Sequence, residues 1–283
     1  MSIEKLSDTR TSVNPPDDID AHPLLGTWSN TSSASRQIAG VRIEVVDGRP
    51  MLHVWGASRP SCRDWGTVPI GRLYRGSPGL PQAAAFEARF DFGPMTALLE
   101  VNLSKGLLII ACMKSFRDGS GRSSYFVREF FRRTDSPSTP RLVPAELGPR
   151  PVTCAEDEVT PNRVSASPPR LDPGLFLGRW VNTDAGTRGV REVRMSDRDG
   201  GLLLELHDAE DRSESVAELF AEHPAGTVAT QFHAAIDRAG RGMLVHGWVK
   251  LGVLVIAVFR DRAGSTAPTP CFDRDFFYQA DRP

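Results

Sequence analysis

Short apolar runs follow one another along the whole chain, and within many of them apolar and polar residues alternate. Alternation with a period of two is typical of half-buried β-strands. Residues that form tight turns, such as Asp47-Gly48 and Phe92-Gly93-Pro94, separate the runs. One segment, Ser213–Phe220, also fits one face of a short helix that would replace a strand. The pattern therefore predicts an all-β protein made of short strands.

The predicted strands fall into two groups with similar spacing. The first group is Val41–Val46, Met51–Ala57, Thr67–Tyr74, Ala84–Asp91, Met95–Asn102, Leu107–Ser115 and Ser124–Arg132. The second group is Arg191–Ser196, Leu202–Asp208, Ser215–Ala221, Val228–Ile236, Met243–Lys250, Val253–Arg260 and Cys271–Tyr278. Strands at such regular spacing predict sandwiches or up-and-down barrels, and a barrel leaves no exposed edge.

The two groups also share sequence, in the same order along the chain. The matching pairs are Leu24–Thr31 with Phe176–Thr183, Phe116–Asp118 with Phe259–Asp261, and Arg128–Phe131 with Arg274–Phe277. A repeat of this length indicates two copies of one domain rather than a solenoid.

A proline-rich segment separates the two copies. Residues 135–173 hold many of the 22 prolines of the chain and an acidic stretch, Glu156-Asp157-Glu158. Such a composition predicts a mobile linker. We therefore expect a disordered N-terminus at 1–20, a first barrel at 21–134, the linker at 135–173 and a second barrel at 174–283.

A short motif opens each copy. Gly26-x-Trp28 and Gly178-x-Trp180 stand directly before the first long strand. This resembles the Gly-x-Trp signature of lipocalins (the calycin group). The resemblance implies two tandem up-and-down barrels, each with its floor closed by the tryptophan and a late arginine packed over it. Arg132 or Arg133 would be that arginine in the first copy, and only Arg274 remains in the second.

Two further blocks, Cys62–Gly66 and Asp118–Arg122, resemble tandem lipocalin-like domains of bacterial proteins.

Charge and motifs exclude several classes of function. The net charge of −1 argues against general nucleic-acid binding, which relies on a basic face. No phosphate loop, nucleophile elbow or zinc-ligand spacing occurs, so we expect no cofactor and no metal. The N-terminus resembles no secretory signal and no apolar run is long enough for a membrane helix, which predicts a cytoplasmic protein. The four cysteines are expected to be reduced thiols, with a Cys62–Cys271 link as the alternative.

Candidate site residues come from strand alternation. His233 and His246 fall on neighbouring strands joined by a hairpin, where they either face each other or lie apart towards solvent or local hydrogen-bond partners. Trp248 shares a face with His246, and Glu100 shares one with Leu98 and Asn102. Pointing into a barrel, such groups would line a pocket that is mostly apolar. The expected catalytic residues are His246, Glu100 and Tyr125, and the expected ligand-binding residues are Trp55, Trp65, Trp248 and His233. For the histidines and aromatics the alternative is ordinary core packing or local hydrogen bonding.

Three functions fit this sequence. The lipocalin resemblance implies binding of an apolar small molecule in a barrel. A cofactor-free cyclase or isomerase of a bacterial natural-product pathway would need only a shaped cavity and one or two polar groups. A structural or protein-interaction module with packed barrels is the third reading. The sequence leaves the oligomeric state open.

Overall fold

The computed structural model describes residues 19–58, 61–76, 80–134, 142–144, 153–158, 169–198, 201–208, 212–238, 241–262 and 269–280. Strands dominate these ranges, and the helical elements in them are two short 3-10 turns, η1 (His22–Leu24) and η2 (Ala155–Glu158). The all-β prediction is confirmed. The helical alternative for Ser213–Phe220 is wrong, because this segment forms strand β14 and pairs with the strands on both sides.

The first group of strands closes into a barrel, here called ring 1. It contains β1 (Gly26–Asn30), β2 (Ile38–Val46), β3 (Arg49–Gly56), β4 (Cys62–Pro69), β5 (Arg72–Arg75), β6 (Ala83–Asp91), β7 (Met95–Ser104), β8 (Leu107–Phe116) and β9 (Tyr125–Thr134). The pairings are antiparallel, and β9 pairs back onto β1. Strands β4 and β5 are two parts of one bent strand, because the N–H groups of Ile70 and Gly71 at the bend still donate to β3 and β6. Counted in this way, ring 1 is a closed barrel of eight strands.

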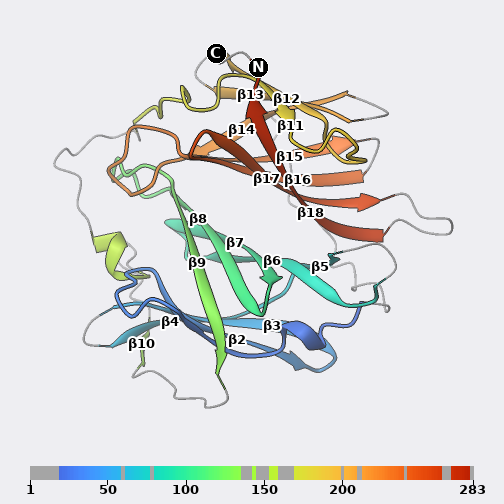
Figure 1. Cartoon of the computed structure of the whole chain (residues 1–283). Helices are drawn as coiled ribbons and strands as arrows, with labels where there is room; N and C mark the ends of the chain where they lie inside the picture. Colours follow the sequence, from blue (N-terminus) through green and yellow to red (C-terminus); the bar gives the residue numbers. More distant parts are fainter. Residues whose placement is uncertain are drawn as a thin grey trace, which may run out of the picture.

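The second group, ring 2, contains β11 (Gly178–Asn182), β12 (Glu192–Arg198), β13 (Gly201–His207), β14 (Arg212–Phe220), β15 (Gln231–Arg238), β16 (Arg241–Lys250), β17 (Val253–Arg262) and β18 (Thr269–Gln279). Each strand pairs antiparallel with the next, and β18 returns to β11. Figure 1 shows ring 2 above ring 1. The remaining strand, β10 (Leu142–Pro144), adds to β4 in parallel.

Both rings start with the same hydrogen bond. The indole N–H of Trp28 donates to the Leu24 carbonyl at 3.0 Å, and that of Trp180 donates to the Phe176 carbonyl at 2.7 Å. Two residues before each tryptophan lies a glycine, with φ of +121° in ring 1 and +115° in ring 2. Because side chains disfavour this backbone region, the Gly-x-Trp spacing has a local conformational cause in both rings.

The residue that covers the tryptophan differs between the rings. In ring 1 the guanidinium of Arg133 lies 4.7 Å from the ring centroid of Trp28, as predicted. In ring 2 the strand partner of Trp180 is Gln279, whose amide donates to a backbone carbonyl. The expectation that Arg274 covers Trp180 is wrong, because Arg274 lies five residues before Gln279 and contacts Trp248 instead.

Strand register also corrects one of the sequence matches. Arg128 pairs with Ala111 in ring 1, and Arg274 pairs with Ala257 in ring 2. Ala111 and Ala257 are therefore equivalent positions. The residues two places after them, Met113 and Phe259, are then also equivalent, so Phe116 is not the counterpart of Phe259. The Phe-Arg-Asp match therefore lies out of register, whereas the Arg128 and Arg274 match is in register.

Apolar side chains fill the described inner faces of both rings. The largest fully buried ones in ring 1 are Trp28, Phe86, Phe90 and Phe131, and those in ring 2 are Phe176, Trp180, Phe232 and Phe277. Interiors of small barrels are commonly filled by side chains in this way. The four cysteines, all within the described ranges, form no disulfide, so the Cys62–Cys271 link is not made.

Part of the predicted linker is folded into the end of ring 1. Residues 153–158, here called the plug, bury Cys154 and Asp157. The ammonium of Lys114, fully buried, contacts both Asp157 carboxylate oxygens at 3.0 and 3.1 Å and the Cys154 sulfur at 2.9 Å. Tyr125 donates to Asp157 at 2.6 Å, and Trp65 donates to the Thr153 carbonyl at 2.8 Å. For these residues the expectation of a mobile linker is wrong, because a buried ion pair holds them.

We predict that Lys114→Met destabilises the protein by about 3–5 kcal/mol, because it leaves the Asp157 carboxylate buried without its cation. Urea unfolding measures this effect. Arg36→Met removes an exposed ion pair with Glu156 of the plug and a hydrogen bond to the Ala155 carbonyl, and should cost only about 1 kcal/mol. Equal losses from the two substitutions would contradict a dominant role for the buried pair.

Candidate functional site between the rings

The outer faces of the two rings pack against each other in a region that we call the junction. Residues from both rings form one apolar cluster there, in which Tyr74 and Ala85 of ring 1 meet Trp248, Val255 and Phe259 of ring 2. A second cluster joins Met113 and Phe126 of ring 1 to Phe220 of ring 2. The strands that line the junction therefore have apolar residues on both faces, which explains their continuous apolar runs.

Polar residues form a row across each side of the junction. Successive strand partners on β6 to β9 are Glu87, Glu100, Ala111 and Arg128. Successive partners on β15 to β18 are His233, His246, Ala257 and Arg274. His233 and His246 are direct partners on β15 and β16, one of the two arrangements that their place on neighbouring strands allowed. In each row a small alanine separates the arginine from two acidic or imidazole side chains. These are Glu87 and Glu100 in ring 1, and His233 and His246 in ring 2.

The junction has approximate two-fold symmetry in its backbone contacts. Tyr125 of β9 forms a parallel bridge with Ala221 of ring 2, and Cys271 of β18 forms a parallel bridge with Arg75 of ring 1. In the register given by the two arginines, Tyr125 corresponds to Cys271. Such reciprocal contacts are typical of an interface between two similar units.

The carboxylate of Glu100 lies at the centre of the junction between two imidazoles. Its Oε2 atom is 3.2 Å from Nδ1 of His246, and its Oε1 atom is 3.4 Å from Nε2 of His233. The side chains of Glu100 and His246 are each 2% exposed, and that of His233 is 13% exposed. His246 also lies against the ring of Phe126, with centroids 4.7 Å apart. Its other nitrogen, Nε2, is buried and has no hydrogen-bond partner within the described ranges.

This arrangement separates the pKa values of the three groups. Burial raises the pKa of Glu100, but its contacts with His233 and His246 outweigh burial and lower it to about 2. Burial lowers the pKa of His233, but the Glu100 carboxylate raises it by more, so the net shift of this pKa is upward. For His246 burial dominates and the pKa is lowered, helped by the positive charges of His233 and Arg128. At neutral pH the geometry therefore favours an ionised Glu100 and an uncharged His246.

Two half-buried arginines from opposite rings meet at Trp248. The guanidinium carbons of Arg128 and Arg274 lie 4.8 and 5.8 Å from the Trp248 ring centroid. Arg274 donates to the Asn102 side-chain oxygen at 2.8 Å, while its Nε atom is buried and unpartnered in the described part of the chain. Neither arginine is among the site residues predicted from strand alternation, although both belong to the Arg128–Phe131 and Arg274–Phe277 match.

Four of the seven predicted site residues gather at the junction: Glu100, His233, His246 and Trp248. Their expected position inside a barrel is wrong. Alternating neighbours such as Leu99 and Val245 fill the inner faces, so these four point outward, towards the other ring.

The other three predicted site residues lie elsewhere. Tyr125 and Trp65 are inside ring 1 and hydrogen bond to the plug, at Asp157 and Thr153. Trp55 is buried on ring 1 beside His53 and Arg42, outside its core cluster. These three side chains therefore do not contribute to the junction.

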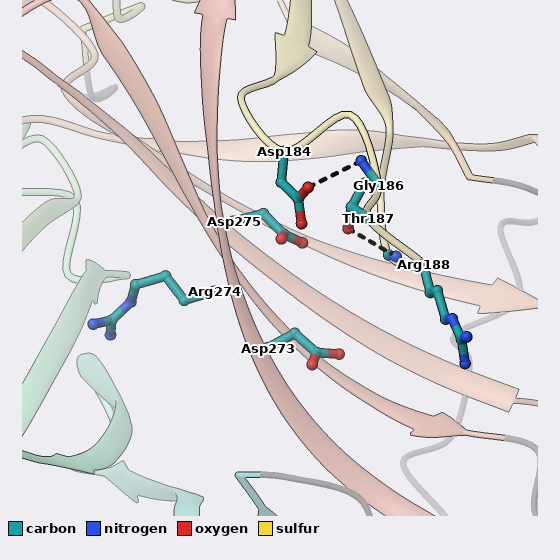
Figure 2. A pocket seen from close by; sticks show the side chains of 8 residues that line it. Asp184, Gly186, Thr187, Arg188, Asp273, Arg274 and Asp275 are labelled. Carbon is teal, nitrogen blue, oxygen red and sulfur yellow. Dashed lines mark hydrogen bonds between the residues drawn. The ribbon is translucent and has the colours of Figure 1, made fainter.

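A polar hollow of about 220 Å³ lies at one end of ring 2. It is lined by Asp184, Gly186, Thr187, Arg188, Gly189, Asp273, Arg274 and Asp275. In Figure 2 the three aspartates lie around the hollow, while the Arg274 side chain points away from it. Aspartate, glycine, threonine and arginine line this hollow, so it is not the mostly apolar pocket predicted from the sequence.

Comparisons with protein-family models and with curated proteins find no match for this chain. None of the helices in the described ranges has the length and apolar character needed to span a membrane. Within the same ranges, no three or more His, Cys, Asp or Glu side chains are grouped so that they could hold a metal ion. The function must therefore be inferred from the junction itself.

We predict that His233 stabilises the fold more in acid than in base. Its pKa is raised on folding from the usual 6.5, so its contribution is fully present below that pH and is lost as the pH rises through the folded value. His233→Gln should therefore cost more free energy of unfolding near about pH 5.5 than near about pH 9. Urea titrations of both proteins at the two pH values measure this difference, with His223→Gln, at an exposed position of ring 2, as the control. An equal cost at both pH values would contradict the pairing with Glu100.

Proposed function

We propose that the protein binds a small organic molecule at the junction. The observation that carries the proposal is the set of buried polar atoms without a protein partner beside the Trp248 ring, above all Nε2 of His246 and Nε of Arg274. Buried polar groups are nearly always hydrogen bonded in folded proteins, so an unpartnered pair next to an aromatic ring favours a ligand site. The packed inner faces of the rings support a site at the junction better than one inside a barrel.

The wider setting of this proposal comes from the sequence. Descent of the two rings from one duplicated lipocalin-like barrel is supported by the repeated Trp28 and Trp180 hydrogen bonds and by the reciprocal bridges. A bacterial source and a cytoplasmic location rest on the sequence patterns alone. A natural-product pathway remains the metabolic setting that we propose.

Catalysis of a proton transfer is the second candidate, favoured by the Glu100–His246 contact. A carboxylate at Nδ1 favours the tautomer that carries the proton there, which leaves Nε2 as an uncharged proton acceptor. This is the arrangement of a general base, and a cofactor-free isomerase or cyclase needs one. Such an enzyme would use His246 as the base, Glu100 to orient it and Trp248 to hold the substrate.

Ligand binding can be tested on the purified full chain. Native mass spectrometry identifies any molecule that accompanies the protein, and a thermal-shift screen of small aromatic acids, amides and alcohols finds others. We predict that Trp248→Leu weakens binding of any hit by about tenfold or more, because it removes the aromatic wall of the site.

Trp55→Leu is the matched control for this test, since Trp55 is a buried tryptophan outside the junction. It should leave the affinity of the hits unchanged. A screen without hits would contradict the proposal and favour a structural or protein-interaction module. Hits that lose affinity in Trp55→Leu but keep it in Trp248→Leu would place the site elsewhere.

The protonation of His246 tests the catalytic candidate separately. We predict that long-range ¹H–¹⁵N spectra at neutral pH show His246 uncharged and protonated at Nδ1. Glu100→Gln should shift the population towards the other tautomer, because the charged acceptor is lost. A charged His246, or a proton on Nε2 in the unsubstituted protein, would rule it out as the general base.

A further inference from the structure

Two cations at the junction, Arg128 and Arg274, have no anionic partner in the described part of the chain. The negative charge of Glu100 is already shared between two histidines at 3.2 and 3.4 Å. Arg128 and Arg274 contact aromatic rings and the neutral Asn102, and neither pairs with a carboxylate among the described residues. Two guanidiniums thus remain without an anion on one face of the molecule.

These two cations are also poorly solvated and close enough to repel each other. Burial, together with the charge of Arg274, lowers the pKa of Arg128 to about 10, and burial lowers that of Arg274. Proteins usually pair such half-buried charges, and an unpaired one costs free energy. The arginines therefore reduce the stability of the free protein, and a bound anion would remove this cost.

We propose that Arg128 and Arg274 form an anion subsite at the rim of the junction, so that its ligand is an organic acid. A carboxylate would accept hydrogen bonds from both guanidiniums, and the apolar part of the acid would lie against Trp248. The planar guanidinium is well suited to this role because it binds a carboxylate through two parallel N–H groups. This inference rests on the proposed function and specifies the chemical class of its ligand.

The position of the two residues supports a shared role. Arg128 and Arg274 occupy equivalent positions in the two rings, beside Ala111 and Ala257. Each arginine contacts a residue of the other ring: Arg128 contacts Trp248, and Arg274 contacts Asn102. Trp248 and Asn102 also occupy equivalent positions in the two rings, two residues after His246 and Glu100. A ligand held by both would therefore touch both rings.

Two probes of the same shape test this inference on the full chain: benzoate, which carries the anion, and benzamide, which is neutral. We expect benzoate to bind more tightly than benzamide. Arg128→Met and Arg274→Met should each weaken benzoate about 10- to 100-fold and change benzamide by less than about twofold. Titrations followed by NMR give the affinities, and Arg212→Met, which removes an arginine paired with Glu205, is the control.

Thermal unfolding of the free variants separates ligand binding from a structural role. Methionine keeps the apolar stem of the arginine and removes the repulsion, so the melting temperature of Arg128→Met should be unchanged or higher without ligand. A clear decrease, with benzoate affinity unaltered, would overturn the subsite and make Arg128 a structural residue.

The remaining outcomes distinguish this inference from the proposed function. Equal binding of both probes, lost in Trp248→Leu but not in the arginine variants, overturns the anion subsite and leaves the junction as a ligand site. Failure of both probes to bind overturns the subsite, and the thermal-shift screen then decides the proposed function alone.

Discussion

The packing of the two rings depends on one buried charge, the carboxylate of Glu100. An ionised carboxylate away from water is stable only when other groups compensate it. Here the compensation comes from the other ring, through His233 and His246, so neither ring alone can satisfy the charge. The apolar clusters around Tyr74 and Phe126 supply the contact area, whereas Glu100 fixes which residues must meet.

The two rings share an architecture but have different polar ends. Ring 1 is closed at one end by the plug, where Lys114 binds Asp157 from a segment outside the barrel. Ring 2 has an internal pair at the corresponding level, in which Arg260 of β17 binds Asp273 of β18 at 3.1 Å. In both cases a buried or half-buried cation near the mouth is neutralised within the protein. The arginines at the junction differ from these two cations because no such carboxylate faces them in the described structure.

Residues at the junction have a structural role and are the ones to which we assign the proposed ligand site. The histidines compensate Glu100, while burial at the same place lowers the pKa of His246 and leaves its Nε2 atom without a partner in the described part of the chain. Groups with perturbed pKa values beside an aromatic ring are often functional, since the same burial that shifts a pKa also excludes water from a ligand. In the function that we propose, the residues that stabilise the junction would therefore also bind the ligand.

The sequence by itself determined the strands and the repeated Gly-x-Trp starts, because these depend on local alternation and turn chemistry, and it placed His233 and His246 on neighbouring strands. Only the tertiary structure decided on which face these residues act. Alternation shows that Glu100 and Leu98 share a face, but not whether that face points into a barrel or towards a second one, since both faces of the junction strands are buried. The plug was missed for a similar reason: Asp157 lies in an acidic, proline-rich segment, and only the distant Lys114 makes its burial favourable.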